Sequence, residues 1–95
     1  MRLKNSEVQF IKEKFQQIFG EGQIYLFGSR VEDHSRGGDI DLFLEVRNQE
    51  NLLNKKWKFL AGIKMSIGDQ KIDIVFNEDE NRLIEKEIKK CRILL

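Results

Sequence analysis

The sequence predicts a small α/β (α+β) domain: a mixed β-sheet with helices packed mainly on one face, in the order α-β-β-α-β-α. Stretches whose apolar residues recur at helical spacing alternate with short apolar runs, which is typical of a domain that combines both kinds of element. The loop between the first two strands is too short for a crossover helix, which predicts an antiparallel pair. A helix joins the second strand to the third, which favours a parallel pair there.

The chain has 95 residues, which is enough for one small domain over residues 1–95. Lys and Arg together number 17 and Asp and Glu 16, so the formal net charge is +1. Because a general nucleic-acid coat carries a large basic excess, nucleic acid is not expected as a primary ligand. A domain this small buries little surface, which favours help from a partner protein or from a homodimer.

The single cysteine, Cys91, excludes an intrachain disulfide and a Cys-rich zinc site. The sequence has no secretory signal and no apolar stretch of the roughly 18–20 residues that span a membrane. We therefore expect a cytoplasmic protein without membrane association.

The first helix is predicted over residues 6–19. Ser6 is the expected N-cap, Gln9 its capping-box partner and Gly20 the C-terminal stop. Phe10 lies nearly opposite the apolar stripe and is either a harmless exposed aromatic residue or a contact for a partner protein. The stripe consists of Val8, Ile11, Phe15, Ile18 and Phe19.

Two strands follow this helix. Residues 24–27 are continuously apolar, which indicates a strand buried on both faces. Residues 39–46 alternate, which predicts that one face packs against helices while the other opens onto a site. The packed face consists of Ile40, Leu42, Leu44 and Val46, and the open face of Asp39, Asp41, Phe43 and Glu45.

A second helix is predicted over residues 50–67, a third strand over 71–76 and a last helix near the C-terminus. Trp57 and Cys91 are interpreted as core residues of these two helices. The lysines of the second helix indicate a solvated face, or one that docks an acidic partner or RNA. The apolar stripe of the second helix consists of Leu53, Trp57, Leu60 and Ile67, and that of the last helix of Ile84, Ile88, Cys91 and Leu95. The lysines are Lys55, Lys56, Lys58 and Lys64.

Three aspartates interrupt the predicted strands. Asp39 and Asp41 are separated by one residue, so their side chains share a face, with Cα atoms about 6.5–7 Å apart. Asp73 lies in the third strand. Burying such charges without a partner is costly, and carboxylate oxygens are ligands that Mg²⁺ prefers. The sequence therefore predicts a two-metal site held by all three acids, with Asp73 bound to the second metal or taking a proton from an attacking hydroxyl.

The turn Gly28-Ser29-Arg30 follows the first strand. Glycine lets the backbone approach a phosphate closely, and N–H groups at a following helical turn attract anions. Ser29 adds a hydroxyl donor, and Arg30 can neutralise phosphate charge with bidentate geometry. These three residues are the predicted nucleotide-binding residues.

The combined pattern resembles the nucleotidyltransferase superfamily of DNA polymerase beta. It consists of Gly28-Ser29, nine residues, Asp39-Ile40-Asp41 and, later, Ile72-Asp73-Ile74. Within that superfamily the chain resembles the minimal nucleotidyltransferases over about residues 5 to 92. Members of the minimal group often have one residue more in the loop after Gly28-Ser29, which leaves the roles of individual loop residues open.

The resemblance implies the nucleotidyltransferase fold and an enzyme that transfers a nucleoside monophosphate to a hydroxyl with release of pyrophosphate; the expected donor is ATP, which supplies AMP. It implies that Asp39 and Asp41 hold Mg²⁺ ions, that Asp73 assists the nucleophile, and that Gly28 and Ser29 bind the triphosphate. Arg30 joins this phosphate group. Minimal nucleotidyltransferases are commonly paired with a small helical HEPN-type protein, and some pairs act as toxin–antitoxin systems in which a tyrosine of the toxin receives AMP.

Two other functions stay open on the sequence alone. The chain can be a non-catalytic antitoxin that neutralises a toxin by masking it, which Phe10 and the small size motivate. It can also modify a small molecule, as aminoglycoside-modifying relatives do, although the sequence offers no second domain to enclose such an acceptor.

Overall fold

The computed structural model describes residues 4–28, 40–68, 71–78 and 82–95, apart from the side chains of residues 66 and 67. The order of its elements follows the predicted order and adds a short strand at the end. The elements are α1 (Asn5–Phe19), β1 (Gly22–Phe27), β2 (Ile40–Val46), α2 (Leu52–Ile67), β3 (Ile72–Phe76), α3 (Leu83–Cys91) and β4 (Ile93–Leu94).

The described strands form one mixed sheet in the order β3-β2-β1-β4. β1 and β2 are antiparallel, and β2 and β3 are parallel, as the lengths of their connections predicted. β4 pairs antiparallel with the other edge of β1. The two central strands are therefore β2 and β1, while β3 and β4 form the edges.

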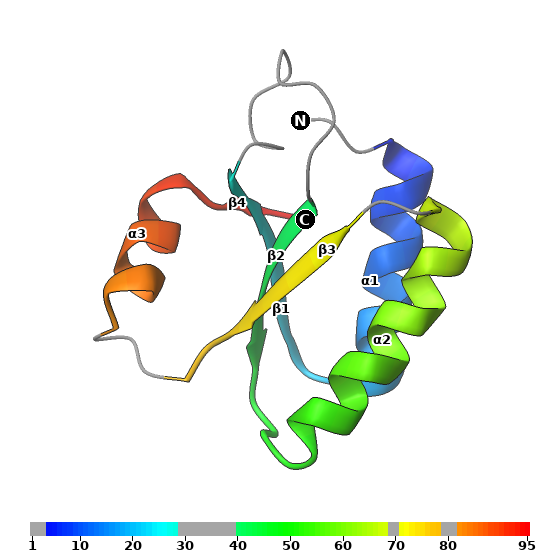
Figure 1. Cartoon of the computed structure of the whole chain (residues 1–95), viewed down its shortest axis with the longest axis horizontal. Helices are drawn as coiled ribbons and strands as arrows, with labels where there is room; N and C mark the ends of the chain where they lie inside the picture. The colour runs from blue at the N-terminus through cyan, green and yellow to red at the C-terminus, as the bar shows by residue number, and fades with distance from the viewer. Residues whose placement is uncertain (1–3, 29–39, 69–70, 79–81) are drawn as a thin grey trace.

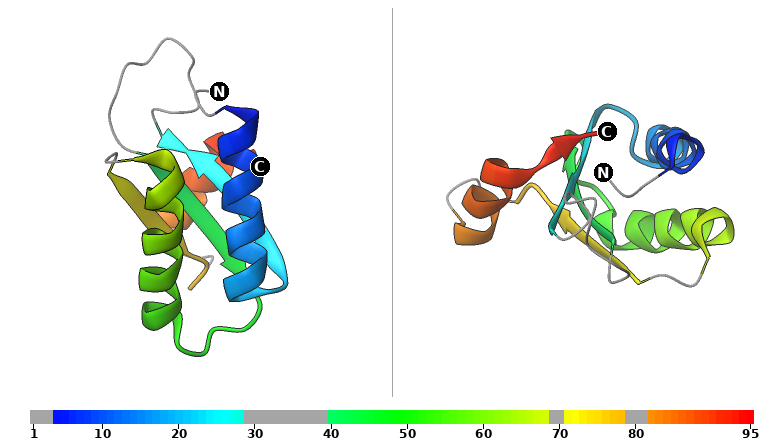
Figure 2. Two further views of the ribbon diagram at one scale, coloured as in Figure 1. Left: turned by 90° about the vertical axis from the view of Figure 1, so that its right-hand side faces the viewer. Right: turned by 90° about the horizontal axis from the view of Figure 1, so that it is seen from above.

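The helices lie on both sides of this sheet. α1 and α2 run antiparallel on one face, and α3 lies on the other (Figures 1 and 2). The core fills the space between the sheet and the helix pair, where the Phe19 ring lies 5.6 Å from the rings of both Phe59 and Phe76. Among the described residues, no helix combines the length and the apolar character of a membrane span. Fully buried core side chains include Ile11, Leu26, Ile40, Leu42, Leu44, Phe59 and Ile63.

The two ends of α1 match the prediction differently. The N-cap is Lys4 and the predicted cap at Ser6 is wrong, because the Lys4 backbone N–H donates to Oε1 of Glu7 at 2.9 Å. The Glu7 carboxylate also interacts favourably with the helix dipole in this first turn. Gly20 ends the helix as predicted, with a φ of 77° and its N–H donating to the Gln16 carbonyl at 3.1 Å.

Phe10 is half-buried and packs against the core, and the Lys14 ammonium lies 5.7 Å from its ring. The expectation of an exposed aromatic residue is therefore wrong. α2 packs along α1 and widens the buried arc beyond the single stripe that the sequence indicated. Phe10 is thus accounted for by packing within the chain.

The buried side of α2 differs from the predicted stripe. Leu53 and Trp57 are 64% and 60% exposed, so their assignment to the core is wrong. Leu60 is buried as predicted, but its buried neighbours lie on the side of the helix that faces α1 and the sheet. The side chain of Ile67 lies outside the described residues. The buried side chains of α2 are Phe59, Leu60 and Ile63.

The C-terminal segment also differs from the predicted single helix. Ile88 is buried, but Ile84 is 48% exposed, Cys91 is exposed, and Leu95 lies beyond the helix. The backbone turns extended at Arg92, and the Leu95 N–H donates to a β1 carbonyl at 3.0 Å. The open edge of β1 offers unpaired backbone groups, and pairing them takes the place of another helical turn.

Candidate active site

Asp41 projects from the face of β2 that points away from α1 and α2. Ile40 and Leu42, its neighbours in the strand, are fully buried in the core. Because successive side chains of a strand point to opposite faces, Asp41 is directed to the other face, where it is half-buried. The alternation that the sequence predicted for this strand therefore positions the acid.

Asp73 lies directly opposite Asp41 in the parallel pair of β3 and β2. Opposite residues share a face of the sheet, and neighbouring strands lie about 4.8 Å apart. Both aspartates are half-buried. The register thus brings together two of the three acids that the sequence singled out.

Gly28 follows β1 immediately beside Asp41. Its φ is 77°, in the left-handed region that side chains rarely adopt. A Cβ atom at this position would overlap Oδ2 of Asp41 and would lie 3.1 Å from its Cγ. The absence of a side chain at Gly28 therefore makes room for the Asp41 carboxylate, a contact that sequence reasoning, which assigned this glycine to phosphate, did not foresee.

Aromatic residues border the acids on this face. Phe27 is the partner of Asp41 in β1, so Phe27, Asp41 and Asp73 form one row across three strands. The next row contains Tyr25 and Phe43, whose ring centroids lie 6.1 Å apart. Apolar surroundings strengthen the electrostatic interactions of a carboxylate with a bound cation.

Arg92 is a member of this region that the sequence did not identify. Its guanidinium lies 3.8 Å from the ring centroid of Tyr25 and 5.6 Å from that of Phe43, and its Nη1 is 3.8 Å from Oε2 of Glu45. Phe43 is consequently buried, although its face was predicted to be open. Arg92 reaches this position only because the chain leaves α3 and pairs with β1, a long-range event without a local sequence signal.

Ser29, Arg30 and Asp39 lie outside the described residues, so their roles stay predictions. Among the residues that the structure describes, no group of three or more His, Cys, Asp or Glu side chains is arranged to hold a metal ion. The described part of the candidate site consists of Gly28, Asp41 and Asp73.

The two described acids fit a divalent cation. They offer hard oxygen ligands from opposite positions of adjacent strands, on the same face of the sheet. Mg²⁺ in nucleotide-dependent enzymes commonly takes one or two carboxylates and completes its octahedron with water and phosphate oxygens. Asp41 and Asp73 meet that requirement by themselves.

Comparison with known proteins identifies a family model. The model described as polymerase beta, nucleotidyltransferase matches residues 9–95. Among curated proteins, no sequence matches the chain.

Solved structures share the fold. A chain in the crystal structure of the toxin–antitoxin MntA-HepT aligns with a TM-score of 0.69 and 16% identity, over 96% of this chain and 70% of that one. A mutant form of that toxin–antitoxin gives a TM-score of 0.69 and 19% identity, over 97% of this chain and 71% of the other. At these identities the likeness establishes the fold, a mixed sheet with helices on both faces.

Proposed function

We propose, on the premise that the chain belongs to the polymerase beta nucleotidyltransferase family, that it transfers AMP from ATP to a hydroxyl of a partner protein. The chain is a nucleotidyltransferase. The identities of the nucleotide, the metal and the acceptor are proposed here. The observation that carries the proposal is the alignment of Asp41 with Asp73 across β2 and β3, with Gly28 leaving space for the Asp41 carboxylate.

The carboxylates are proposed to hold Mg²⁺ and to receive a proton. Asp41 and Asp73, with Asp39 two residues before Asp41 in the sequence, would hold a pair of Mg²⁺ ions. When bound, the ions supply positive charge that offsets the charge of the triphosphate and lowers the pKa of the attacking hydroxyl. Asp73 is the residue that we assign to accept the hydroxyl proton.

The transfer conserves the atoms of both substrates. The acceptor oxygen forms a bond to the α-phosphorus, while the bond from that phosphorus to the bridging oxygen breaks and pyrophosphate leaves with the electron pair. We assign Gly28, Ser29 and Arg30 to the β- and γ-phosphates, because backbone N–H groups, a hydroxyl and a guanidinium are suitable donors to phosphate oxygens. These assignments keep the leaving group in line with the attack.

A HEPN-type helical protein is the proposed partner, in an antitoxin-like pair. The likeness of the fold to a chain of the MntA-HepT toxin–antitoxin supports this choice of partner class.

The proposal is tested by transfer of label from α-labelled ATP to the partner in the presence of Mg²⁺. Asp41→Asn and Asp73→Asn keep side-chain volume and remove charge, and we expect each to lower the transfer rate by at least about 100-fold. Removing Mg²⁺ with a chelator should abolish transfer, and adding Mg²⁺ back should restore it.

Glu45→Gln is the matched control for these variants. Glu45 lies on the same strand and the same face as Asp41 but two rows farther from the acids. Its rate should stay close to that of the unaltered chain. If Asp41→Asn transfers label as fast as Glu45→Gln, the assignment of the acids is wrong.

A further inference from the structure

The edge strand β3 lies at the bottom of an apolar groove between α2 and α3. In Figure 1, β3 crosses in front of β2 with α2 on one side and α3 on the other. Within the described residues β3 pairs with β2 alone. The groove has a volume of about 430 Å³, and its lining includes Leu53 and Lys56 of α2, Ile74 and Val75 of β3, and Ile84 of α3.

The hydrogen-bonding pattern shows which backbone groups of β3 face this groove. The Ile40 N–H donates to the Lys71 carbonyl at 2.9 Å, and the Asn77 N–H donates to the Leu44 carbonyl at 3.3 Å. Because alternate residues of a parallel strand bond to the same neighbour, the odd-numbered residues of β3 face β2. The backbone N–H and C=O groups of Ile72 and Ile74 therefore point to the open edge.

Large apolar side chains flank the same edge. Leu53 and Trp57 on the α2 side are 64% and 60% exposed, and Ile84 on the α3 side is 48% exposed. Open edge strands bordered by exposed apolar side chains are sites at which another chain can pair. No described strand pairs with this edge of β3, whereas β1 is paired on both sides, with β2 and β4.

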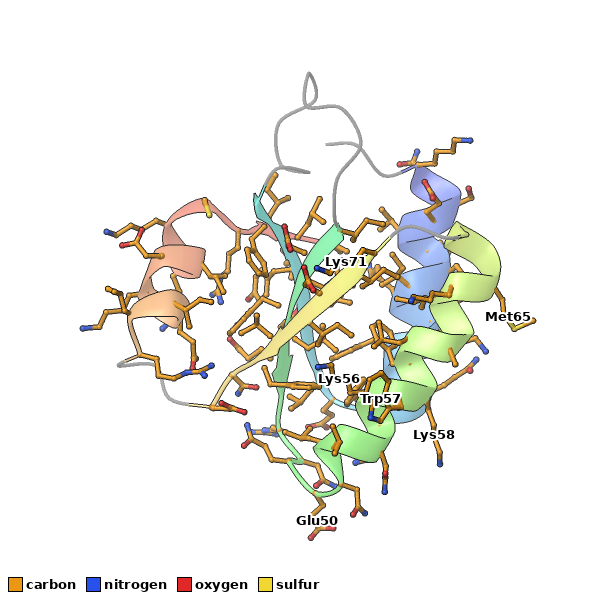
Figure 3. The ribbon with its side chains drawn as sticks, viewed as in Figure 1. Glu50, Lys56, Trp57, Lys58, Met65 and Lys71 are labelled. Atoms are coloured by element: carbon orange, nitrogen blue, oxygen red, sulfur yellow. The ribbon has the colours of Figure 1, made fainter. Side chains whose placement is uncertain are left out.

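Charge distinguishes the two walls of the groove. The sequence of α2 contains four lysines and no acidic residue, in a chain whose net charge is only +1. At 100° per residue, Lys64 lies on the same stripe as Leu53 and Trp57, and Lys56, which lines the groove, lies about 60° from Leu53. No described residue forms an ion pair with either lysine. Figure 3 shows Lys56 extending from α2 toward β3, beside Trp57.

The α3 wall carries one basic and two acidic side chains that pair with one another. Arg82 pairs with Glu78 at 2.9 Å and with the buried Glu85 at 2.9 Å. Arg82 also donates to the Phe76 carbonyl at 3.2 Å. This carbonyl, at the end of β3, points to the open edge, so Arg82 already occupies it. A ligand therefore meets Lys56, with which no other described residue forms an ion pair, on the α2 side, and on the α3 side the apolar Val75 and Ile84 beside the Arg82–Glu78 ion pair.

We propose that β3 is a docking edge for an extended acidic segment of a partner protein, which adds as a fifth strand in this groove. Its side chains alternate, with acidic residues directed toward Lys56 and Lys64 and apolar residues toward Val75 and Ile84. A second copy of the chain fits less well, because it would bring another lysine-rich, acid-free α2 to the same edge. RNA fits less well because the groove is apolar.

The probe for this proposal is a blocked eight-residue peptide in which valine and glutamate alternate. Trp57 is the only tryptophan of the chain, and Nζ of the groove-lining Lys56 lies 5.9 Å from its ring centroid, so its fluorescence should respond when a ligand reaches Lys56. We expect a shift of its emission to shorter wavelength that saturates with peptide at about 0.15 M salt, where charges more than about 8 Å apart are largely screened.

Charge-reversal pairs on one helix provide the matched comparison. Lys56→Glu with Lys64→Glu should weaken peptide binding at least about tenfold, because Lys56 lines the groove and Lys64 lies on the same side of α2. Lys55→Glu with Lys58→Glu changes the net charge equally on the other side of α2 and should leave affinity within about twofold. Equal effects of the two pairs would overturn the assignment of the groove.

Three further ligands or readouts decide the mode of binding. The peptide with every backbone nitrogen methylated should not bind, since it cannot pair with β3. The proposal is contradicted if the methylated peptide binds or if the unmodified peptide causes no emission shift. It is also contradicted if an oligouridine RNA displaces the unmodified peptide, or if the chain self-associates and the peptide disrupts that association. Asp41→Asn should bind the peptide normally, which separates this surface from the proposed transfer chemistry.

Discussion

At the scale of single residues, the candidate site depends on the close approach of Gly28 to Asp41. The carboxylate occupies the place where a Cβ atom of residue 28 would lie. Conformational freedom alone does not explain this glycine, because Gly20 has the same φ of 77° with no atom near its missing side chain. The two glycines therefore separate the backbone cost of a substitution from its effect on the acid.

Gly28→Ala and Gly20→Ala form a matched pair for this distinction. Both should lose about 1–2 kcal/mol of unfolding free energy, since each forces a left-handed φ on an alanine. Only Gly28→Ala displaces the Asp41 carboxylate, so only this variant should lose nucleotidyl transfer, by at least about tenfold. Urea unfolding and the labelled-ATP assay measure the two quantities; equal loss of transfer in both variants would contradict the role of the contact.

At the scale of elements, the connection from β3 to α3 depends on a buried carboxylate. Glu85 is 2% exposed, and its Oε2 accepts from Nε of Arg82 at 2.9 Å and from the Glu78 backbone N–H at 3.2 Å. Arg82 in turn donates to the carbonyl of Phe76, the last residue of β3. One acid thus ties the end of the edge strand to the first turn of the helix.

Removing this acid should loosen the whole connection. Glu85→Ala removes the buried carboxylate that accepts from the Glu78 N–H and from Arg82, and we expect a loss of about 2–3 kcal/mol in unfolding free energy. Glu87→Ala on the same helix removes an exposed pair with Lys90 at 3.4 Å and should change stability by less than about 0.5 kcal/mol. Chemical denaturation of both variants checks the difference, and similar losses would show that Glu85 has no special role.

At the scale of the whole molecule, the chain presents two separate surfaces. The aligned acids lie on the α3 side of the sheet near the start of β2 and β3. The docking edge that we propose runs along β3 between α2 and α3. In the proposals made above, the acids serve nucleotide transfer and the edge of β3 serves a partner protein.

This separation predicts how catalysis and masking differ in cells. If transfer neutralises a toxic HEPN-type partner, Asp41→Asn should still co-purify with that partner but should no longer restore growth. If masking is the mechanism, the same variant should restore growth in full. Growth on co-expression and recovery of the complex on affinity resin measure the two outcomes, with Glu45→Gln as the variant that should behave normally in both.

Much of the fold could be predicted because it depends on local patterns. The alternation of β2, the apolar run of β1 and the helical spacing of α1 are set by neighbouring residues, and the loop lengths set the strand directions. The predictions failed where distant partners decide. Trp57 is exposed because α2 turns Phe59 and Ile63 toward the core, and the final segment becomes β4 because the edge of β1 is open.

The sequence by itself determined the order of the elements from α1 to α3, the mixed directions of the first three strands and the presence of acids on strands, because side-chain periodicity and connection length act along the chain. Only the tertiary structure decided that Asp73 lies opposite Asp41, that Gly28 yields space to the Asp41 carboxylate, and that Arg92 covers Tyr25. The alternation of a strand restricts its register to positions that keep its apolar side chains on the core face. Which residues then lie opposite one another, and which edge is paired, depend on contacts between segments far apart in the sequence.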